Sequence, residues 1–448
     1  KDIIDHMVNK SIFKSYDIRG IYPSELNETA AYNIGRAFIK YTKAKKVAVG
    51  YDARLSSPTL YKALINGLTT EGAEFKIIGQ IPTEVLYFAV AKYDFNGGIM
   101  ITASHNPKEY NGFKMIKKTG DEIVIIRGKD LLPAIDDKKL DNKSSQKVIE
   151  KDILDNYLKY ILNLIDIKNV KNFKVAIDAS NGVAGNVISK ITLPVEIIPL
   201  NFESDGNFPN HSPNPLNPGA SDQIKDLIKK EKADFGFIFD ADADRIFLVD
   251  ENSELVDADL VLLLLAKYFL QKNSGARIVY NAVCSKVVPE FVKKWGGTPI
   301  RTKVGAVNVR DGLLENSGIV GGEVSAHYSF RDYFFMDSGM MALLIMLKII
   351  SDDGRKVSKI IKELSIYFKT DINFEVENKE EIMGKIKQKY LDGKQDYLDG
   401  VTVEYKDWWF NVRPSNTEPL LRLTIEADTK DLLEQKKEEL NNFIKRTS

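Results

Sequence analysis

The sequence is poor in the features that mark secreted, disulfide-stabilised and nucleic-acid-binding proteins. Its single cysteine, Cys284, cannot form a disulfide within the chain, which excludes a disulfide-rich scaffold and favours a reducing compartment. The 63 basic and 63 acidic residues give a formal net charge of zero, so no overall field attracts nucleic acid or an anionic membrane. Any phosphate-binding site must therefore be local.

Long apolar runs are also missing. The richest ones, LVLLLLA from 260 and MMALLIMLKII from 340, are too short to cross a bilayer and predict buried helices. The first residues, KDIIDHMVNK, mix charges with short apolar pieces and lack the core of a signal peptide. We therefore expect a cytoplasmic protein with no nucleic-acid partner and no membrane contact.

The order of elements predicts several domains, because 448 residues are too many for one ordinary core. Short apolar, β-branched runs such as KVAVGYD (46–52) and GGIMITAS (97–104) alternate with helical segments, which predicts parallel α/β sheets. After about residue 368 the strands lie close together, which predicts a small α+β domain with an antiparallel sheet. We predict four domains, at 1–150, 151–253, 254–367 and 368–448.

A candidate metal site follows one predicted strand, in the segment FIFDADADR. Asp240, Asp242 and Asp244 are close enough to repel one another unless a cation neutralises them. A ligand set of oxygens, with neither His nor Cys, favours Mg²⁺, Mn²⁺ or Ca²⁺ over zinc. The alternative is an acidic surface turn, which the apolar run DFGFI before it disfavours. The spacing does not fit an EF-hand loop.

A candidate phosphate site lies in FNVRPSNTEPLLR. The guanidinium of Arg413, the hydroxyl and amide side chains after it and the exposed N–H groups of a turn are suited to binding a phosphate. The alternative is an ordinary hairpin turn.

A candidate sugar site lies in GGEVSAHYSF, where Glu323, Ser325 and His327 alternate. In an extended segment these three side chains point to one side and can bind sugar hydroxyls, and His327 can exchange protons near neutral pH. The alternative is the polar face of an edge strand.

The segment GIMITASHNPKEYNGFK contains a serine and a histidine in sequence. Ser104 and His105 should point opposite ways in an extended chain, and no GxSxG elbow is present here, so a hydrolase nucleophile is disfavoured. The alternative for Ser104 is a turn or cap residue. A long polar loop and the cation of Lys114 ten residues later favour phosphate chemistry at this serine. In SYDIRGIYPSE, near the start, Tyr16 and Arg19 occupy a predicted turn, from which Arg19 can reach a phosphate.

Four of these segments, TASHNP, DADADR, GEVSAH and RPSNTEP, resemble the phosphoserine, magnesium, sugar-recognition and phosphate-binding loops of the α-D-phosphohexomutase superfamily. The resemblance covers essentially the whole chain and is closest to the phosphomannomutase and phosphomannomutase/phosphoglucomutase members. It implies the four-domain phosphohexomutase architecture, which has three α/β domains with mixed sheets and then a small α+β domain like the TATA-binding protein.

The resemblance also implies an activity, namely interconversion of mannose 6-phosphate and mannose 1-phosphate, and also of the glucose phosphates. The reaction would use a phosphoserine enzyme, Mg²⁺ and a hexose 1,6-bisphosphate that serves as intermediate and activator. The implied partners are small hexose phosphates, and we expect a monomer or weak dimer. The implied metal ligands are Asp240, Asp242, Asp244 and Ser104. The implied catalytic residues are Ser104, Lys114, His327, Arg245 and Arg19, with proton transfer assigned to either Lys114 or His327. The implied substrate-binding residues are Tyr16, His105, Glu323, Ser325, Arg413, Ser415, Asn416 and Thr417.

The chain departs from the family pattern at three positions. Ala241 stands where the metal loop commonly has Gly, which removes no ligand. Ala306 and Val283 stand where dual-specificity members have His and Lys, which weakens the inference about sugar contacts there, and nearby Lys303 is a candidate substitute. The loop after GE lacks the Gln typical of phosphoglucosamine mutases, which favours mannose. A single hydrogen bond discriminates by roughly 0.5–1.5 kcal/mol, so glucose is an expected second substrate.

Other functions stay open from the sequence. They are phosphoglucomutase or phosphoglucosamine mutase as the main activity, an aspartyl-phosphate phosphatase that uses Asp240 as nucleophile, and an inactive sugar-phosphate-binding paralogue. The phosphatase leaves Ser104 without a role, and the intact Ser104 and aspartates disfavour the inactive paralogue.

Overall fold

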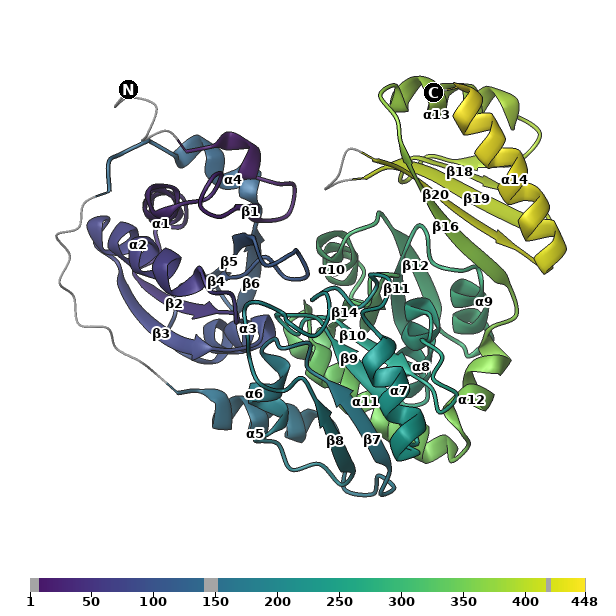
Figure 1. The fold of residues 1–448 in the computed structure, drawn as a ribbon, viewed down its shortest axis with the longest axis horizontal. Helices are drawn as coiled ribbons and strands as arrows, with labels where there is room; N and C mark the ends of the chain where they lie inside the picture. Colours follow the sequence, from purple (N-terminus) through teal and green to yellow (C-terminus); the bar gives the residue numbers. More distant parts are fainter. Residues whose placement is uncertain (1–7, 141–151, 416–419, 448) are drawn as a thin grey trace. The chain divides into compact units, whose positions relative to one another are not determined.

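The computed structural model describes residues 8–140, 152–415 and 420–447 (Figure 1). The chain divides into two compact units, one of Lys1–Val256 with Asp332–Val357 and one of Asp257–Arg331 with Ser358–Ser448. Across the described ranges, no helix is both long and apolar enough to cross a membrane. The predicted domain limits at 150, 253 and 367 stay predictions.

The first unit begins with a mixed, six-stranded sheet of order β1-β5-β4-β2-β3, with β6 paired to β5. β2 is parallel to β3 and β4, whereas β5 is antiparallel to β1, β4 and β6. The strands are β1 (Ile18–Ile21), β2 (Lys46–Tyr51), β3 (Glu74–Gln80), β4 (Gly97–Ile101), β5 (Tyr110–Thr119) and β6 (Glu122–Ile126). The helices are α1 (Glu28–Thr42), α2 (Ser57–Thr70), α3 (Thr83–Lys92) and α4 (Gly128–Leu131), with short 3-10 turns at Lys10–Ile12 and Leu132–Ala134.

A second sheet of the first unit has the order β10-β9-β7-β8, with only β10 antiparallel. Its strands are β7 (Lys174–Asp178), β8 (Glu196–Leu200), β9 (Phe235–Phe239) and β10 (Ile246–Val249). The helices are α5 (Leu154–Leu164), α6 (Ala184–Ile188) and α7 (Asp222–Glu231), and the returning segment supplies β15 (Met336–Asp337) and α11 (Gly339–Asp353). Every residue of β9 is buried, as the run before the aspartates predicted, and every residue of β10 is buried as well.

The second unit begins with strands in the order β12-β11-β13-β14, parallel except for β14. They are β11 (Arg277–Asn281), β12 (Thr298–Thr302), β13 (Val320–Gly322) and β14 (Tyr328–Phe330). The helices are α8 (Ala258–Leu270), α9 (Val287–Lys294), α10 (Ala306–Glu315) and α12 (Val357–Leu364), and a 3-10 turn spans Arg331–Tyr333. The apolar runs at 260 and 340 form the buried helices α8 and α11, which confirms that prediction.

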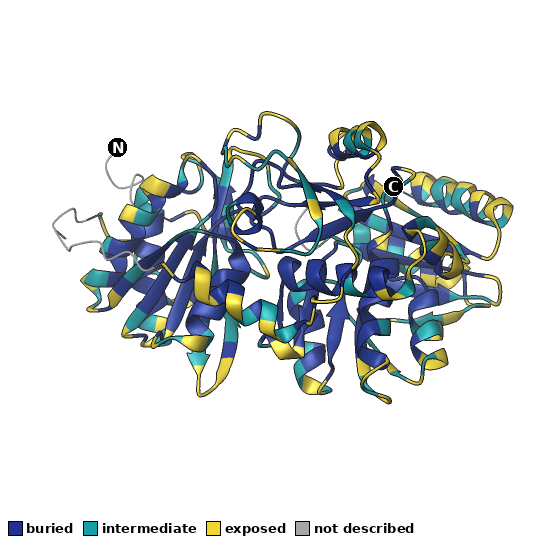
Figure 2. Cartoon of the chain, turned by 90° about the horizontal axis from the view of Figure 1, so that it is seen from below, coloured by how far each residue is buried: buried dark blue, intermediate teal, exposed yellow. Residues whose placement is uncertain are grey.

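The C-terminal part of the second unit is an antiparallel sheet of order β16-β20-β19-β18-β17, which confirms the predicted α+β domain. Its strands are β16 (Phe368–Glu375), β17 (Lys394–Asp396), β18 (Val401–Glu404), β19 (Trp408–Pro414) and β20 (Leu420–Ala427). The helices are α13 (Lys379–Lys389) and α14 (Lys430–Thr447), which share a core with the sheet. In Figure 2 the strands are largely dark blue, and exposed residues lie mainly on helices and loops.

The alternation of strands and helices predicted parallel pairing correctly for β2 with β3 and β4, for β7 with β8 and β9, and for β11 with β12 and β13. It did not predict the antiparallel strands β5, β10 and β14, which the resemblance implied. Each of these three strands follows its neighbour in the sheet through a loop that carries polar side chains, so the loops that matter lie at antiparallel connections.

Candidate active site

Ser104 lies in the loop between β4 and β5 and is only 1% exposed. Its backbone is in the left-handed region, with φ of 50°. The Ser104 N–H donates to Thr102 Oγ1 at 2.8 Å, and its hydroxyl donates to Asp240 Oδ2 at 3.0 Å. The loop therefore holds a buried hydroxyl against the first of the three aspartates.

His105 does not point away from Ser104, so that expectation was wrong. Its Nδ1 lies 3.2 Å from Ser104 Oγ. The expectation assumed an extended chain, in which adjacent side chains alternate. The left-handed backbone of Ser104 turns the chain and brings the imidazole beside the hydroxyl.

Arg54 positions the serine loop, and the sequence reasoning missed it. This side chain is 1% exposed, lies just after β2 and bonds to Asp52 Oδ2 at 3.1 Å. Its guanidinium also donates to loop carbonyl oxygens at 2.6 to 2.9 Å, those of Ser104, Asn106, Pro107 and Tyr110. The charged YDAR segment directly after a predicted strand was the available signal.

The three aspartates follow β9 and form one buried cluster, with carboxylate oxygens within 4.8 Å of one another. Burial raises the pKa of Asp240; the charge of Arg245 lowers it, and those of Asp242 and Asp244 raise it further. Among the residues that the structure describes, the buried Asp242 Oδ1 has no hydrogen-bond partner. The cluster thus offers several oxygen ligands, one of them without a partner in the described ranges, and such a donor set suits a hard divalent cation.

Basic and hydroxyl side chains surround the aspartates. Lys114 Nζ contacts Asp242 Oδ2 at 2.6 Å and also Asp244 Oδ2. Burial lowers the pKa of Lys114, but these two carboxylates more than offset it, so the pKa lies above its ordinary value. Thr83, at the start of α3, donates its hydroxyl to Asp242 Oδ2 at 2.6 Å, and the sequence reasoning missed it.

Two arginines contact this site, Arg245 at Asp240 and Arg19 at the serine loop. Arg245 Nε donates to Asp240 Oδ2 at 2.9 Å, while its buried Nη2 has no partner in the described ranges. Arg19, on β1, donates through Nη1 to Ala103 O at 3.2 Å and to Asn106 Oδ1 at 2.5 Å, and so contacts the serine loop. Tyr16 precedes β1.

The loop that carries the three aspartates depends on close backbone approach. A Cβ at Gly182 would lie 2.4 Å from Ala241 O, so only glycine fits there. The N–H of Val183 donates to the same carbonyl at 3.0 Å. Ala241 is fully buried and its side chain is no ligand, so the Gly-to-Ala departure leaves the cluster intact.

Glu323, Ser325 and His327 converge in the second unit, but not on an extended strand as expected. They occupy the turn between β13 and β14, where Ala326 has φ of 66°. Glu323 Oε1 accepts from Ser325 Oγ and lies 3.1 Å from His327 Nδ1, and Oε2 accepts from Gly305 N at 2.9 Å. Burial raises the pKa of Glu323, but His327, Ser325 and Gly305 outweigh it and lower the pKa to about 2.

Arg413 lies on β19 and is only 6% exposed. Burial lowers the pKa of Arg413, and the charges of Asp399, Glu323 and Asp371 partly offset this lowering. Ser415 follows β19, and its N–H donates to Leu420 O at 2.8 Å. Asn416 and Thr417 lie outside the described residues.

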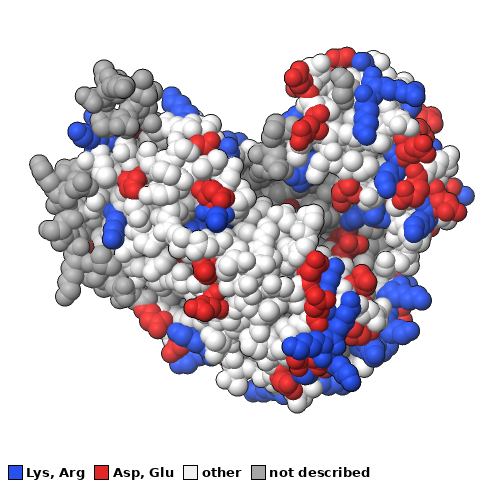
Figure 3. All heavy atoms as spheres, in the orientation of Figure 1, with Lys and Arg blue, Asp and Glu red and all other residues white. Residues whose placement is uncertain are grey.

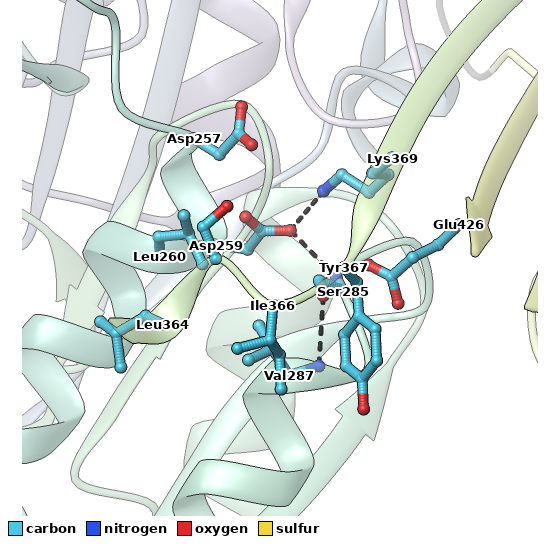
Figure 4. A pocket seen from close by; sticks show the side chains of 11 residues that line it. Asp257, Asp259, Leu260, Ser285, Val287, Leu364, Ile366, Tyr367, Lys369 and Glu426 are labelled. Carbon is cyan, nitrogen blue, oxygen red and sulfur yellow. Dashed lines mark hydrogen bonds and ion pairs between the residues drawn. The ribbon is translucent and has the colours of Figure 1, made fainter. Parts of the chain in front are cut away.

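A small pocket in the second unit lies where the chain passes from α12 to β16 (Figure 4). Lys369 pairs there with Asp259, which also accepts from Ser285 N at 2.9 Å. Glu426 Oε1 accepts from the Lys286 N–H at 3.0 Å. The pocket contains no predicted site residue, and these internal contacts indicate a structural role. The full lining is Asp257, Asp259, Leu260, Ser285, Val287, Leu364, Ser365, Ile366, Tyr367, Lys369 and Glu426.

On the face shown in Figure 3, basic and acidic side chains are interspersed, as the net charge of zero predicts. The buried carboxylate cluster, by contrast, gathers three acidic side chains at one place.

The architecture, three sheets with crossover helices followed by an antiparallel C-terminal sheet, is that of a four-domain phosphohexomutase. Models of phosphoglucomutase/phosphomannomutase match the chain four times: α/β/α domain I at residues 10–130, domain II at 155–253, domain III at 257–367 and the C-terminal domain at 372–443. The chain belongs to the phosphoglucomutase/phosphomannomutase family.

Similar proteins of known name span the whole chain. A phosphomannomutase of Vibrio cholerae serotype O1 is 37% identical and covers 98% of this chain and 99% of its own length. A phosphomannomutase of Methanocaldococcus jannaschii is 38% identical, with 97% of both chains covered. The crystal structure of a phosphoglucomutase/phosphomannomutase family protein from Burkholderia thailandensis superposes with a TM-score of 0.86 at 31% identity, over 98% of both chains.

Proposed function

We propose that the chain is a phosphomannomutase that interconverts mannose 6-phosphate and mannose 1-phosphate and also accepts the glucose phosphates. The observation that carries this proposal is the Ser104 hydroxyl bonded to a buried cluster of three aspartates, in a chain 37% identical to a phosphomannomutase over 98% of its length. A buried serine beside clustered carboxylates is suited to carrying a phosphoryl group next to a divalent cation.

The cation would be Mg²⁺, held by Asp240, Asp242, Asp244 and Ser104. The unpartnered Asp242 Oδ1 and the oxygen-only donor set support this assignment. When bound, the ion stabilises the negative charge of the transferring phosphoryl group.

The protein groups around the serine would complete that charge balance. Lys114 contacts two of the aspartates, Arg245 keeps Nη2 without a partner among the described residues, and Arg19 contacts the serine loop. These cations would stabilise the negative charge on the equatorial oxygens of a loose phosphoryl transition state. Such a transition state is stabilised mainly by electrostatic interactions with the protein.

In the reaction the bond from Ser104 Oγ to phosphorus breaks, and a bond forms from phosphorus to the free hydroxyl of a hexose monophosphate. The hydroxyl proton passes to a base, while the departing Ser104 Oγ takes up a proton. After the hexose 1,6-bisphosphate reorients, the reverse exchange transfers its other phosphate to Ser104 Oγ, which gives up its proton as the sugar oxygen regains one. His327 is our choice of base over Lys114, because it shares a turn with Glu323 and Ser325 and is oriented through Nδ1.

Substrate binding would fall to the second unit, together with Tyr16 and His105 of the first. Glu323, ionised and oriented by Ser325, His327, Gly305 and Asn281, would bind sugar hydroxyls with Ser325. The phosphate that does not react would be bound by Arg413, Ser415, Asn416 and Thr417. We further propose a cytoplasmic monomer or weak dimer that a trace of hexose 1,6-bisphosphate activates.

The deciding experiment measures kcat/KM for the 1-phosphates of mannose, glucose and glucosamine, with Mg²⁺ and a trace of glucose 1,6-bisphosphate. We expect mannose first, glucose second and glucosamine last. Peptide mass mapping of the purified protein should place phosphate on Ser104. Phosphate on Asp240 and never on Ser104, or no turnover of any hexose phosphate, would overturn the proposal.

A further inference from the structure

Two successive N–H groups in the loop before α10 bind carboxylates from different parts of the second unit. The N–H of Val304 donates to Asp399 Oδ2 at 2.8 Å, and that of Gly305 donates to Glu323 Oε2 at 2.9 Å. Gly305 has φ of 123°, a conformation that residues with side chains avoid, so the loop geometry depends on glycine. The loop therefore joins Asp399 to the sugar-recognition glutamate.

Asp399 itself is fixed beside the strand that carries Arg413. It lies in the turn between β17 and β18, and its carbonyl accepts from Asn411 Nδ2 at 2.8 Å. The next residue, Gly400, has φ of 70°, and a Cβ there would lie 2.2 Å from Val412 O. The turn thus packs directly on β19, and the Asp399 carboxylate acts electrostatically on Arg413.

We propose that Asp399 is a positioning residue for sugar recognition, which holds the loop at 303–305 so that Gly305 N–H fixes the carboxylate of Glu323. This inference rests on the proposed function, in which Glu323 binds the hexose. Asp399 thus bonds to two parts of the second unit, because its carboxylate accepts from the 303–305 loop and its carbonyl accepts from Asn411 on the strand that carries Arg413.

The Val304 N–H links Asp399 to the position of Glu323. Without the Asp399 carboxylate, Val304 N–H loses a charge-assisted bond and the loop gains freedom. Glu323 keeps its contacts with Ser325 and His327, so it stays folded into the turn but its Oε2 loses a fixed donor. The effect should fall on sugar affinity and sugar discrimination, and not on phosphoryl chemistry at Ser104.

The test compares Asp399→Ala, Asp399→Asn and Asp396→Asn in the full chain. Asp396 is the matched control, because it lies three residues earlier and pairs with Arg301 Nη1 at 2.9 Å rather than with the loop. Loss of one hydrogen bond to a charged group predicts a KM for mannose 1-phosphate about tenfold higher in Asp399→Ala, with kcat less affected. Asp399→Asn keeps an acceptor oxygen and should restore most of the affinity, and Asp396→Asn should change KM by less than about twofold.

Hydrogen exchange of the peptide containing Val304 and Gly305 supplies a readout that does not depend on turnover. Asp399→Ala should speed exchange there and leave the rate of phospho-Ser104 hydrolysis unchanged. Unchanged exchange, or a KM within twofold of wild type, would overturn the inference. If exchange speeds but the wild-type chain turns over no hexose phosphate, the proposed function fails while the Asp399 contact with the loop stands.

Discussion

Ser104 and Asp240 are 136 residues apart in the chain, and the Ser104 hydroxyl donates to Asp240 Oδ2 at 3.0 Å. The serine loop follows β4 in one sheet and the aspartate loop follows β9 in another, so the fold of the first unit brings them together. The same hydroxyl lies 3.2 Å from His105 Nδ1. Its closest side-chain partner is therefore a proposed metal ligand and not the neighbouring base.

Substitution of this serine should abolish the mutase reaction. Ser104→Ala removes the phosphoryl carrier, so we expect kcat to fall by roughly 10³-fold or more while hexose phosphate affinity stays close to wild type. Calorimetric binding and a coupled rate assay check the two parts. Ser11→Ala, at an exposed serine, is the control. A Ser104→Ala enzyme with wild-type turnover would exclude the phosphoserine mechanism.

Removal of the metal, or of one of its proposed aspartate ligands, should reduce turnover. Chelation with EDTA should stop turnover and added Mg²⁺ should restore it. Asp242→Asn replaces a carboxylate that bonds to both Lys114 and Thr83, and we expect the Mg²⁺ concentration for half-maximal rate to rise by about tenfold or more. Asp226→Asn, at an exposed aspartate, should leave it unchanged. Full activity after complete metal removal would contradict the assignment.

Substitution of Arg54 should lower both the free energy of unfolding and the rate. Its guanidinium bonds to the carbonyl oxygen of Pro107, 53 residues away in the chain. Lysine cannot reproduce the planar fork of donors that bonds to four loop carbonyls, so Arg54→Lys should lower the unfolding free energy by about 2–4 kcal/mol and reduce kcat. Urea denaturation and the rate assay measure both. Arg277→Lys, at an exposed arginine, is the control. Unchanged stability would show that the loop holds its shape without the guanidinium.

Glu323 should affect sugar binding and leave metal binding intact. Glu323→Ala removes a carboxylate that four groups orient, so KM for mannose 1-phosphate should rise by about tenfold or more. Calorimetric Mg²⁺ affinity should match wild type, because the proposed ligands belong to the first unit. A lost metal affinity with normal KM would contradict the assignment of the two sites.

Glu84 should make stability depend on pH. This buried carboxyl, at the start of α3, accepts from Ser338 Oγ and from Met340 N at 3.1 Å, and burial raises its pKa to about 8. Between its ordinary pKa near 4.5 and this raised value the folded chain keeps a proton on Glu84, whereas the unfolded chain releases it. The contribution of Glu84 to the free energy of unfolding is therefore complete below pH 4.5 and is lost as the pH rises toward 8.

The measurement is the urea midpoint of wild type and Glu84→Gln between pH 5 and 8. Glutamine keeps an acceptor for Met340 and cannot ionise, so the wild type should lose stability relative to the variant as pH rises, by at most about 1.4 kcal/mol per pH unit. Glu74→Gln, at an exposed glutamate, should show no such difference. Parallel pH profiles for wild type and Glu84→Gln would contradict a raised pKa.

The sequence predicted the parts of the site whose chemistry is local. Three aspartates at alternating positions after a buried strand predict a cation site without knowledge of the fold. The alternation of strands and helices predicts the parallel strands. Arg54, Thr83 and Asp399 were missed because the groups they bond to are distant in sequence: a loop carbonyl for Arg54, the Asp242 carboxylate for Thr83 and the Val304 N–H for Asp399. The errors at His105 and at the Glu323 turn share one cause, since both assumed an extended chain where Ser104 and Ala326 have positive φ.

The division of the chain into two units bears on how such an enzyme can change its substrate over evolutionary time. The serine, its aspartates and Lys114 belong to the first unit, whereas the Glu323 turn and Arg413 belong to the second. Substitutions that alter the choice of sugar can accumulate around the second group, away from the proposed base His327, and leave the serine and its aspartates in the first unit unchanged. A new specificity would then arise from an already competent catalyst, which makes this fold a favourable starting point for engineering enzymes that act on other sugars.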